Sequence, residues 1–247
     1  MKTLPVCIFT HNRTKVACAT VDALINHLKC SGRDLRWILC DDLSNHGHVG
    51  TLLAEFRNRG IEPSVHRNDS ARHGLGASMN RGLDDAFSTS PLCFRIEDDW
   101  LLKRDLDVSG WVEAMERLPI ASVRLGMMFR TPQELLPMDV AAGLWRLRST
   151  ARRIYDFNNQ VAIVARSFHE KAGGYPENVD PQKAELYMAR KYMEMSSRGA
   201  RPPFVCWPKG MATNVHYHDT LPFDHCGESS IGHKYWKIPP KYASINR

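Results

Sequence analysis

Three consecutive carboxylates, Glu97, Asp98 and Asp99, follow directly on the strand-forming run 92–96. Like charges this close repel one another, so the folded chain needs a positive charge beside them. A hard divalent cation with oxygen ligands meets that need, and a metal that holds a diphosphate is a common use of such a site. The alternative is a solvated acidic turn at the end of an edge strand.

Polar side chains also stand at the ends of two earlier predicted strands. The apolar runs 4–10 and 35–40 both lead into polar segments. In an open parallel sheet, ligands bind beyond the carboxyl ends of the strands, so we expect the three polar ends to form one site. The side chains concerned are Thr10, Asn12, Arg13, Asp41, Asp42, Glu97, Asp98 and Asp99.

The elements that must position these side chains alternate between strand and helix. Apolar residues recur at helical spacing in 16–28, 49–56 and 75–87, each after a predicted strand. This alternation over about a hundred residues is typical of an α/β domain with a mainly parallel central sheet. The second half is less regular, with a buried strand predicted at 160–164 and a helix that begins at Pro181.

The composition narrows the class of protein. The chain has 247 residues and a formal net charge of +6, which fits one domain and a partner that carries negative charge. Its seven cysteines include no Cys-x-x-Cys pair, which predicts a reducing, cytoplasmic compartment rather than a disulfide framework. We recognise no signal peptide, and no apolar run approaches the roughly 20 residues of a membrane span, so we expect none.

Five segments form a pattern when they are taken together. They are a strand with a Thr-x-Asn-Arg turn at 6–13, an Asp-Asp-x-Ser turn at 40–44, a Gly-rich segment ending in Asn-x-Gly at 72–82, the acidic triplet, and a Gly-Gly-Tyr-Pro-Glu turn at 173–177. This pattern resembles the GT-A glycosyltransferases, most closely those of glycosyltransferase family 2. The resemblance spans roughly residues 4–200 and is specific in the first half.

The resemblance implies a fold and a division of the chain. The fold is an α/β GT-A (nucleotide-diphospho-sugar transferase) fold, a Rossmann-like α/β/α sandwich with a mainly parallel central sheet. Residues 1–247 then form a single GT-A domain. About 1–105 bind the nucleotide sugar, and about 106–247 provide the acceptor-binding half and the C-terminal tail.

The resemblance also implies roles for the polar residues. Asp99 is the direct ligand of Mn2+ or Mg2+, which bridges the donor phosphates, and Asp98 faces ribose or a metal-bound water. Asp41 accepts a base N–H, and Asp42 holds ribose hydroxyls. The donor is a nucleotide-diphosphate sugar, with a UDP-sugar favoured, and the reaction is hexosyl or pentosyl transfer. The nucleotide-sugar-binding residues are Thr10, Asn12, Arg13, Asp41, Asp42, Arg72, Gly74, Asn80, Glu97 and Asp98.

Transfer to an acceptor hydroxyl also needs a base. In inverting members of the family a carboxylate of a Glu-Asp element takes the proton, and the matching residues here are Ala184, Glu185 and Leu186. Glu185 therefore carries this role alone, and Asp180 is its rival. The alternative for Glu185 is an ordinary exposed position on a helix.

A histidine near the C-terminus is the third expected contributor to the metal site. Several GT-A enzymes draw a metal ligand from such a histidine, and His216 and His218 lie at a spacing of two, on one face of a predicted strand. Most of the 11 histidines cannot be ligands, so the alternative is that neither binds metal.

Other classes of protein share some of these features. A nucleotidyltransferase of similar fold also uses paired carboxylates with a metal, but it usually has a Gly-rich basic loop after the first strand, where this chain has Thr-His-Asn-Arg. A non-enzymatic nucleic-acid-binding protein would use the basic stretch 146–153 and the basic, aromatic tail 234–247. A glycosyltransferase whose acceptor is a modified nucleic-acid base would combine two of these functions.

Overall fold

The computed structural model describes residues 2–125, 135–147, 159–196, 204–208 and 222–226. The strands of these residues are β1 (Thr3–Thr10), β2 (Leu28–Lys29), β3 (Asp34–Asp41), β4 (Ser64–Arg67), β5 (Leu92–Glu97), β6 (Trp100–Leu102), β7 (Leu106–Asp107), β8 (Ile120–Arg124), β9 (Leu135–Asp139), β10 (Leu144–Leu147), β11 (Ala162–Ala165), β12 (Phe204–Pro208) and β13 (Phe223–His225). The helices are α1 (Thr14–His27), α2 (His46–Arg57), α3 (Gly74–Thr89), α4 (Ser109–Arg117), α5 (Arg166–Ala172) and α6 (Pro181–Ser196).

Nine of the described strands form one sheet in the order β4-β3-β1-β5-β11-β8-β12-β10-β9. The four strands of the first half pair in parallel, because the chain returns to the same end of the sheet through a helix each time. β11 is antiparallel to both β5 and β8, so the second half of the sheet is mixed. The α/β class is confirmed, and the sheet is parallel where it carries the three polar strand ends.

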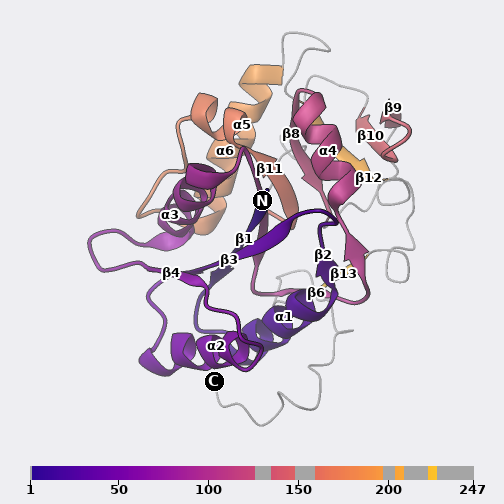
Figure 1. The fold of residues 1–247 in the computed structure, drawn as a ribbon. Helices are drawn as coiled ribbons and strands as arrows, with labels where there is room; N and C mark the ends of the chain where they lie inside the picture. The colour runs from indigo at the N-terminus through magenta and orange to yellow at the C-terminus, as the bar shows by residue number, and fades with distance from the viewer. Residues whose placement is uncertain (1, 126–134, 148–158, 197–203, 209–221, 227–247) are drawn as a thin grey trace.

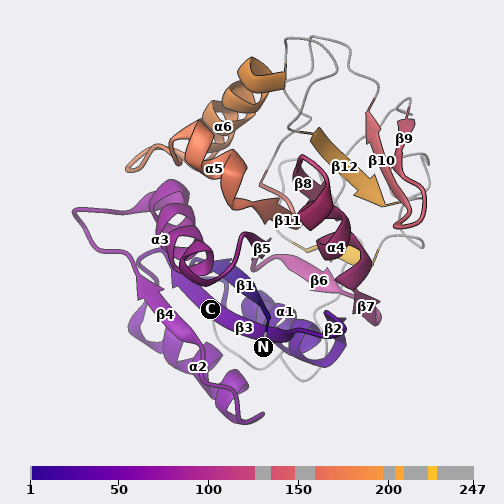
Figure 2. The same ribbon diagram turned by 45° about the horizontal axis from the view of Figure 1, so that its top comes forward.

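Helices cover both faces of the first half of the sheet (Figure 1, Figure 2). α1 and α2 pack against each other on one face, and α3 packs against β1 and β3 on the other. α3 approaches the sheet closely, since a Cβ at Gly82 would lie 2.5 Å from the Sγ of Cys40. The fully buried apolar core of this half includes Ile8, Ile38 and Phe94. None of the described helices is long and apolar enough to cross a membrane.

The register of the parallel strands sets their polar ends in line. Thr10 pairs with Asp41 across β1 and β3, and Asp41 pairs with Arg67 across β3 and β4. On the other side of β1, Phe9 pairs with Glu97. The three strand ends that the sequence marks as polar therefore meet at one edge of the sheet, and Arg67 joins them there.

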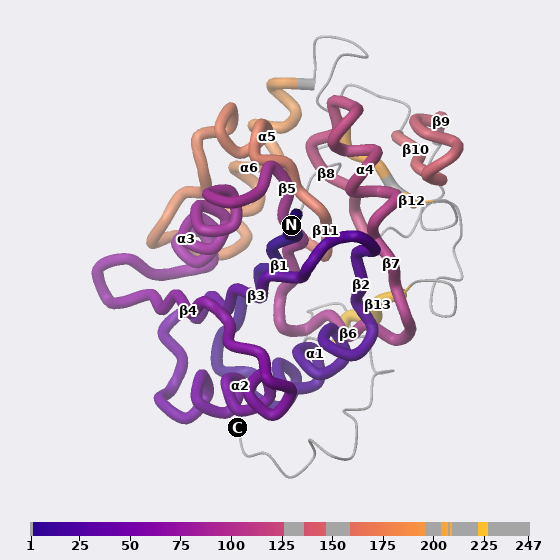
Figure 3. The backbone as a smooth tube through the Cα atoms, viewed as in Figure 1, coloured from indigo at the N-terminus to yellow at the C-terminus, as the bar shows by residue number. Residues whose placement is uncertain are grey.

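The C-terminal part of the chain returns to this edge. β13 pairs antiparallel with β6, the short strand that follows the acidic triplet, and His225 is the partner of Trp100. Figure 3 shows the yellow trace of β13 beside β6. A residue more than a hundred positions later thus reaches the surroundings of the triplet.

Candidate functional site

The acidic triplet is largely enclosed by the protein. Asp98 is fully buried, and Asp99 is 4% exposed. Oδ2 of Asp98 accepts hydrogen bonds from the Thr10 hydroxyl at 2.6 Å and from the backbone N–H of His11 at 3.2 Å. Burial raises the pKa of Asp98 to about 6, against the opposing positive charge of Arg13. The chain therefore does not form a solvated acidic turn here.

Arg13 is the cation that bridges two of the carboxylates. It occupies the N-cap position of α1. One terminal nitrogen of its guanidinium lies 2.6 Å from Oδ2 of Asp99, and the other forms an ion pair with Oδ1 of Asp98. Burial lowers the pKa of Arg13, but the charges of Asp98 and Asp99 outweigh this effect and raise it. The sequence analysis places Arg13 among the nucleotide-sugar-binding residues, whereas in this structure its guanidinium contacts the carboxylates of Asp98 and Asp99.

His225 is the histidine that reaches the triplet. Its Nε2 lies 3.3 Å from Oδ2 of Asp99, and its ring packs on Trp100 with the centroids 4.8 Å apart. Burial tends to raise the pKa of Asp99, but the hydrogen bond from His225 and the charge of Arg13 together hold it below its usual value. His216 and His218, which the sequence favours, lie outside the described residues. No local pattern separates His225 from the other histidines, so sequence reasoning missed it.

Asp99 and His225 each present one unpaired atom of a kind that binds divalent cations. Oδ1 of Asp99 and Nδ1 of His225 are both buried, and neither has a hydrogen-bond partner among the described residues. Carboxylate oxygens are the preferred ligands of Mg2+, and imidazole is a common ligand of other divalent metals. Within the part of the chain that the structure describes, no three His, Cys, Asp or Glu side chains converge as a ready ligand set. A Mg2+ bound through one or two carboxylates and substrate phosphates needs no such set.

A buried histidine supports Asp98 through a chain of hydrogen bonds. His48 of α2 is 3% exposed, with Nε2 2.7 Å from Oγ1 of Thr10 and Nδ1 2.8 Å from Oγ1 of Thr14. Because Thr10 donates its one hydroxyl hydrogen to Asp98, it must accept from His48, so the proton of the ring is on Nε2. Burial lowers the pKa of His48, which favours this neutral form. Sequence reasoning missed His48 as well.

Asp41 ends β3 as a fully buried carboxylate. Its Oδ2 accepts from the backbone N–H of Ser44 at 3.2 Å and from Nε of Arg67 at 3.1 Å. Its Oδ1 has no hydrogen-bond partner among the described residues, and such a buried acceptor costs about 1–3 kcal/mol. Asn12 ties the neighbouring loops together, since its N–H donates to Oγ of Ser44 and its Oδ1 accepts from the N–H of Asn45, both at 2.8 Å.

Asp42 holds the loop that leads into α3. Its Oδ1 accepts from the backbone N–H of Gly74 at 2.7 Å and from Nδ2 of Asn68 at 2.9 Å. Gly74 has a φ of +85°, a left-handed conformation that favours glycine. Gly74, which the sequence analysis assigns to nucleotide-sugar binding, thus donates its N–H to Asp42.

The Gly-rich segment docks on the second half of the chain. Arg72 donates two hydrogen bonds to the carboxylate of Glu177, at 2.6 and 2.5 Å. Asn80 pairs with both backbone groups of Tyr175, at 2.8 and 2.9 Å, and donates to Glu177 at 2.8 Å. Arg72 and Asn80, both expected to contact the nucleotide sugar, are therefore engaged at this junction.

Glu185 lies in a polar network near the triplet. Its Oε1 accepts from the backbone N–H of Asn159 at 2.9 Å, and Oδ1 of Asn159 accepts from Tyr175 at 2.9 Å and from the buried Arg95 at 3.1 Å. Burial, and after it the charges of Asp99 and Glu185, raise the pKa of Glu97 to about 8. The fold thus brings Glu185 close enough to Glu97, at the end of β5, for its charge to raise the pKa of that carboxyl.

Asp180 has a different setting at the start of α6. It is exposed, its Oδ1 accepts from the backbone N–H of Gln182 at 2.9 Å, and its carbonyl accepts from the N–H of Ala184 at 3.1 Å. These contacts cap the helix. A catalytic role for Asp180 stays a prediction.

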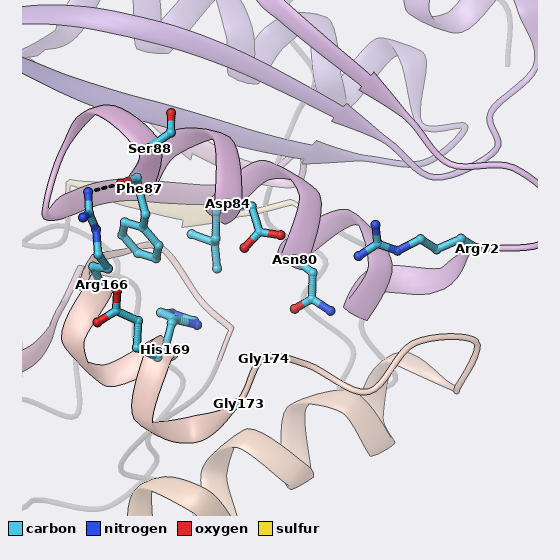
Figure 4. A pocket seen from close by; sticks show the side chains of 11 residues that line it. Arg72, Asn80, Asp84, Phe87, Ser88, Arg166, His169, Gly173 and Gly174 are labelled. Carbon is cyan, nitrogen blue, oxygen red and sulfur yellow. Dashed lines mark hydrogen bonds between the residues drawn. The ribbon is translucent and has the colours of Figure 1, made fainter.

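A cavity of about 520 Å³ lies apart from these strand ends, between α3 and α5 (Figure 4). His169 lies in its wall, where burial and then the charge of Arg95 lower the pKa of the imidazole to about 3. Arg166 donates to the carbonyl of Phe87, the dashed contact in Figure 4. Neither the acidic triplet nor Glu185 lines this cavity. Its lining residues are Arg72, Asn80, Leu83, Asp84, Phe87, Ser88, Arg166, His169, Glu170, Gly173 and Gly174.

The fold is similar to that of solved glycosyltransferases. Mannosyltransferase PcManGT from Pyrobaculum calidifontis, in complex with GDP-Man and Mn2+, is 18% identical with a TM-score of 0.53, and the match covers 87% of this chain and 58% of that one. S. aureus TarS 1-349 in complex with UDP-GlcNAc is 13% identical with a TM-score of 0.62, and the match covers 86% and 57%. The chain therefore spans less than two thirds of either protein, and its fold is the GT-A fold. No family model and no curated protein matches the sequence.

Proposed function

We propose that this protein is a metal-dependent glycosyltransferase that moves a sugar from a nucleotide-diphosphate sugar to an acceptor hydroxyl. The observation that carries the proposal is the meeting of Asp41, Asp99 and His225 at one sheet edge of a GT-A fold. The GDP-Man and Mn2+ bound by PcManGT, and the UDP-GlcNAc bound by TarS, support a donor of this class.

On the donor side, the buried acceptor Oδ1 of Asp41 receives an N–H of the nucleotide base. Asp99 and His225 would hold Mn2+ or Mg2+, and Asp98 would support this site. When bound, the metal supplies positive charge that stabilises the leaving diphosphate without a proton. His48 and Thr10 keep the Asp98 carboxylate in one orientation.

On the acceptor side, Glu185 takes the proton of the attacking hydroxyl. The acceptor oxygen bonds to the anomeric carbon of the donor sugar, and the bond from that carbon to the diphosphate oxygen breaks. The nucleoside diphosphate leaves, and the proton goes to the carboxylate of Glu185. The N–H of Asn159 fixes one oxygen of this carboxylate and so orients the other. A single displacement of this kind inverts the configuration of the sugar.

For the finer specificity we favour a UDP-sugar as donor and a modified nucleic-acid base as acceptor. The support for the nucleic-acid acceptor is the net charge of +6 and the basic segments of the second half, most of which lie outside the described residues. Among the described ones, Arg146 packs over the ring of Phe204 at 5.0 Å. Binding to DNA that weakens steeply with added salt supports this acceptor, and binding that is absent or insensitive to salt removes it.

A panel of nucleotide sugars tests the activity directly. We expect release of nucleoside diphosphate that requires Mn2+ or Mg2+ and depends on the sugar and the base of the donor. Mass spectrometry of the products then separates two reactions. Addition of a sugar to the acceptor supports a hexosyl- or pentosyltransferase, and release of pyrophosphate identifies a nucleotidyltransferase and overturns the proposal.

A further inference from the structure

We propose that Arg13 is a resident counter-ion, which neutralises Asp98 and Asp99 in the free protein and moves onto the diphosphate when metal and nucleotide bind together. The inference rests on the proposed function, because it concerns the same site. It goes beyond that function in making the binding of metal and the binding of nucleotide interdependent through one side chain.

The first half of this inference follows from the contacts of Arg13. Its two terminal nitrogens each take one carboxylate, Asp99 at 2.6 Å and Asp98 in an ion pair. Both carboxylates are nearly inaccessible to water, so their charges need a close partner. The guanidinium supplies it, and a planar fork of donors is well suited to two neighbouring carboxylates.

The need for Arg13 to move follows from competition for the same oxygens. Oδ2 of Asp99 already faces both Arg13 and His225, and Oδ1 of Asp99 is the buried atom without a partner. A divalent cation held by Asp99 would stand beside the guanidinium, and two cations at such a distance repel one another. Arg13 therefore opposes the binding of metal alone.

Its destination is set by the loop that carries it. Asn12 fixes the backbone of the loop through Ser44 and Asn45, so the side chain of Arg13 can move while its Cα stays in place. The side chain is 42% exposed, which leaves it room on the solvent side. The only negative charge that arrives there with a donor is the diphosphate, and arginine binds phosphate oxygens in a bidentate manner.

Two consequences can be measured without any catalytic assay. Metal and nucleoside diphosphate must each strengthen the binding of the other, and the factor must be the same from both directions. Replacing Arg13 by methionine must strengthen the binding of metal alone and weaken this mutual effect. Asp99 and His225 are unchanged in that variant, so the proposed ligands of the metal remain.

The experiment is a titration of the protein with Mn2+, followed by the electron paramagnetic resonance signal of free Mn2+, without nucleotide and with saturating UDP or GDP. We expect Arg13→Met to bind Mn2+ alone about tenfold more tightly than the wild type, and nucleotide to enhance the binding of Mn2+ by a factor that is about tenfold larger in the wild type than in Arg13→Met. Arg67→Met is the matched control, because it removes one positive charge that pairs with Asp41 and not with the triplet. It should leave the affinity for Mn2+ alone unchanged.

Equal affinity of the wild type and Arg13→Met for Mn2+ alone overturns the inference, as does an equal gain in Arg67→Met. If neither nucleotide binds any form while Arg13→Met still gains affinity for Mn2+, the competition stands and the proposed function fails. Circular dichroism checks the fold of the variant, and Arg13→Gln serves if Arg13→Met does not fold. In the wild type, the side-chain NMR signal of Arg13 should shift on addition of Mg2+ with UDP or GDP, and an unmoved signal contradicts the displacement.

Discussion

The hydroxyl of Thr10 donates a 2.6 Å hydrogen bond to Oδ2 of Asp98, a residue 88 positions later in the chain. Thr10 is bonded in turn to His48 of α2, and His48 to Thr14. A helix on one face of the sheet therefore helps to orient the carboxylate of Asp98 at the edge of the sheet. The direction of every bond in this chain is fixed, because Asp98 can only accept when it is ionised. Thr10 thus links His48 to Asp98 of the acidic triplet through its hydroxyl group.

Replacing Thr10 by valine should remove both hydrogen bonds of the hydroxyl while keeping the shape of the side chain. We expect a loss of about 1–3 kcal/mol in the free energy of unfolding, since His48 and Asp98 each lose a partner in a buried place. A double-mutant cycle with His48→Ala, measured by urea denaturation, should give a coupling energy of about 0.5–3 kcal/mol. Strictly additive effects would contradict the hydrogen-bond chain.

Replacing Asp99 by asparagine tests the assignment of the metal ligand. The amide has nearly the shape of the carboxylate but lacks its charge, so we expect a loss of at least about a hundredfold in turnover of the donor, with the fold retained. The measurement is the release of nucleoside diphosphate. Asp105→Asn is the control, because Asp105 is an exposed aspartate that pairs with His27 and Lys29. Full activity of Asp99→Asn refutes the assignment.

His225→Ala should weaken the binding of Mn2+ in the presence of nucleotide. A loss of about tenfold or more is expected, since even residues that only support metal ligands cause losses of 10- to 100-fold. Calorimetric titration with Mn2+ measures it. His27→Ala, which removes an exposed histidine that pairs with Asp105 and not with the triplet, should bind Mn2+ as the wild type does. An unchanged affinity in His225→Ala would show that the metal uses other ligands.

Gly76→Ala should destabilise the junction between α3 and the turn of the second half. An added Cβ would lie 1.9 Å from the carbonyl oxygen of Pro176, so the backbone must shift, and we expect a loss of about 2 kcal/mol or more in the free energy of unfolding. Gly50→Ala in α2 is the matched control, since its Cβ meets nothing within 4 Å and should stabilise the helix by about 0.5–1 kcal/mol. Thermal unfolding of both variants compares them.

His169 should make the stability of the protein depend on acid pH. Its pKa is lowered by burial from 6.5 to about 3, so between these values the unfolded chain binds a proton that the folded chain does not. The contribution of His169 to the free energy of unfolding is therefore fully present above pH 6.5. It is lost as the pH falls below that value, by up to about 1.4 kcal/mol per pH unit. His169→Phe removes this contribution, so the free energy of unfolding of the variant should rise relative to that of the wild type as the pH falls. A constant difference in urea denaturation from pH 6.5 down to about 4 would contradict the prediction.

The sequence by itself determined the strand ends and what they carry. An apolar run that stops at charged residues records the point where a buried strand reaches water, so Thr10, Asp41 and the acidic triplet could be found from local pattern. Helices between parallel strands return each strand to the same end, so their convergence at one edge followed from the same pattern. This is why the α/β class and the meeting of these polar strand ends at one edge could be predicted.

Only the tertiary structure decided which distant residues complete that edge. His225 reaches Asp99 through the pairing of β13 with β6, and His48 reaches Asp98 through Thr10. It also decided that Arg13 rests on the carboxylates and that the Gly-rich segment docks on the turn at 173–177. These contacts join residues tens to more than a hundred positions apart, and they depend on register and packing, which the local periodicity of a sequence does not record.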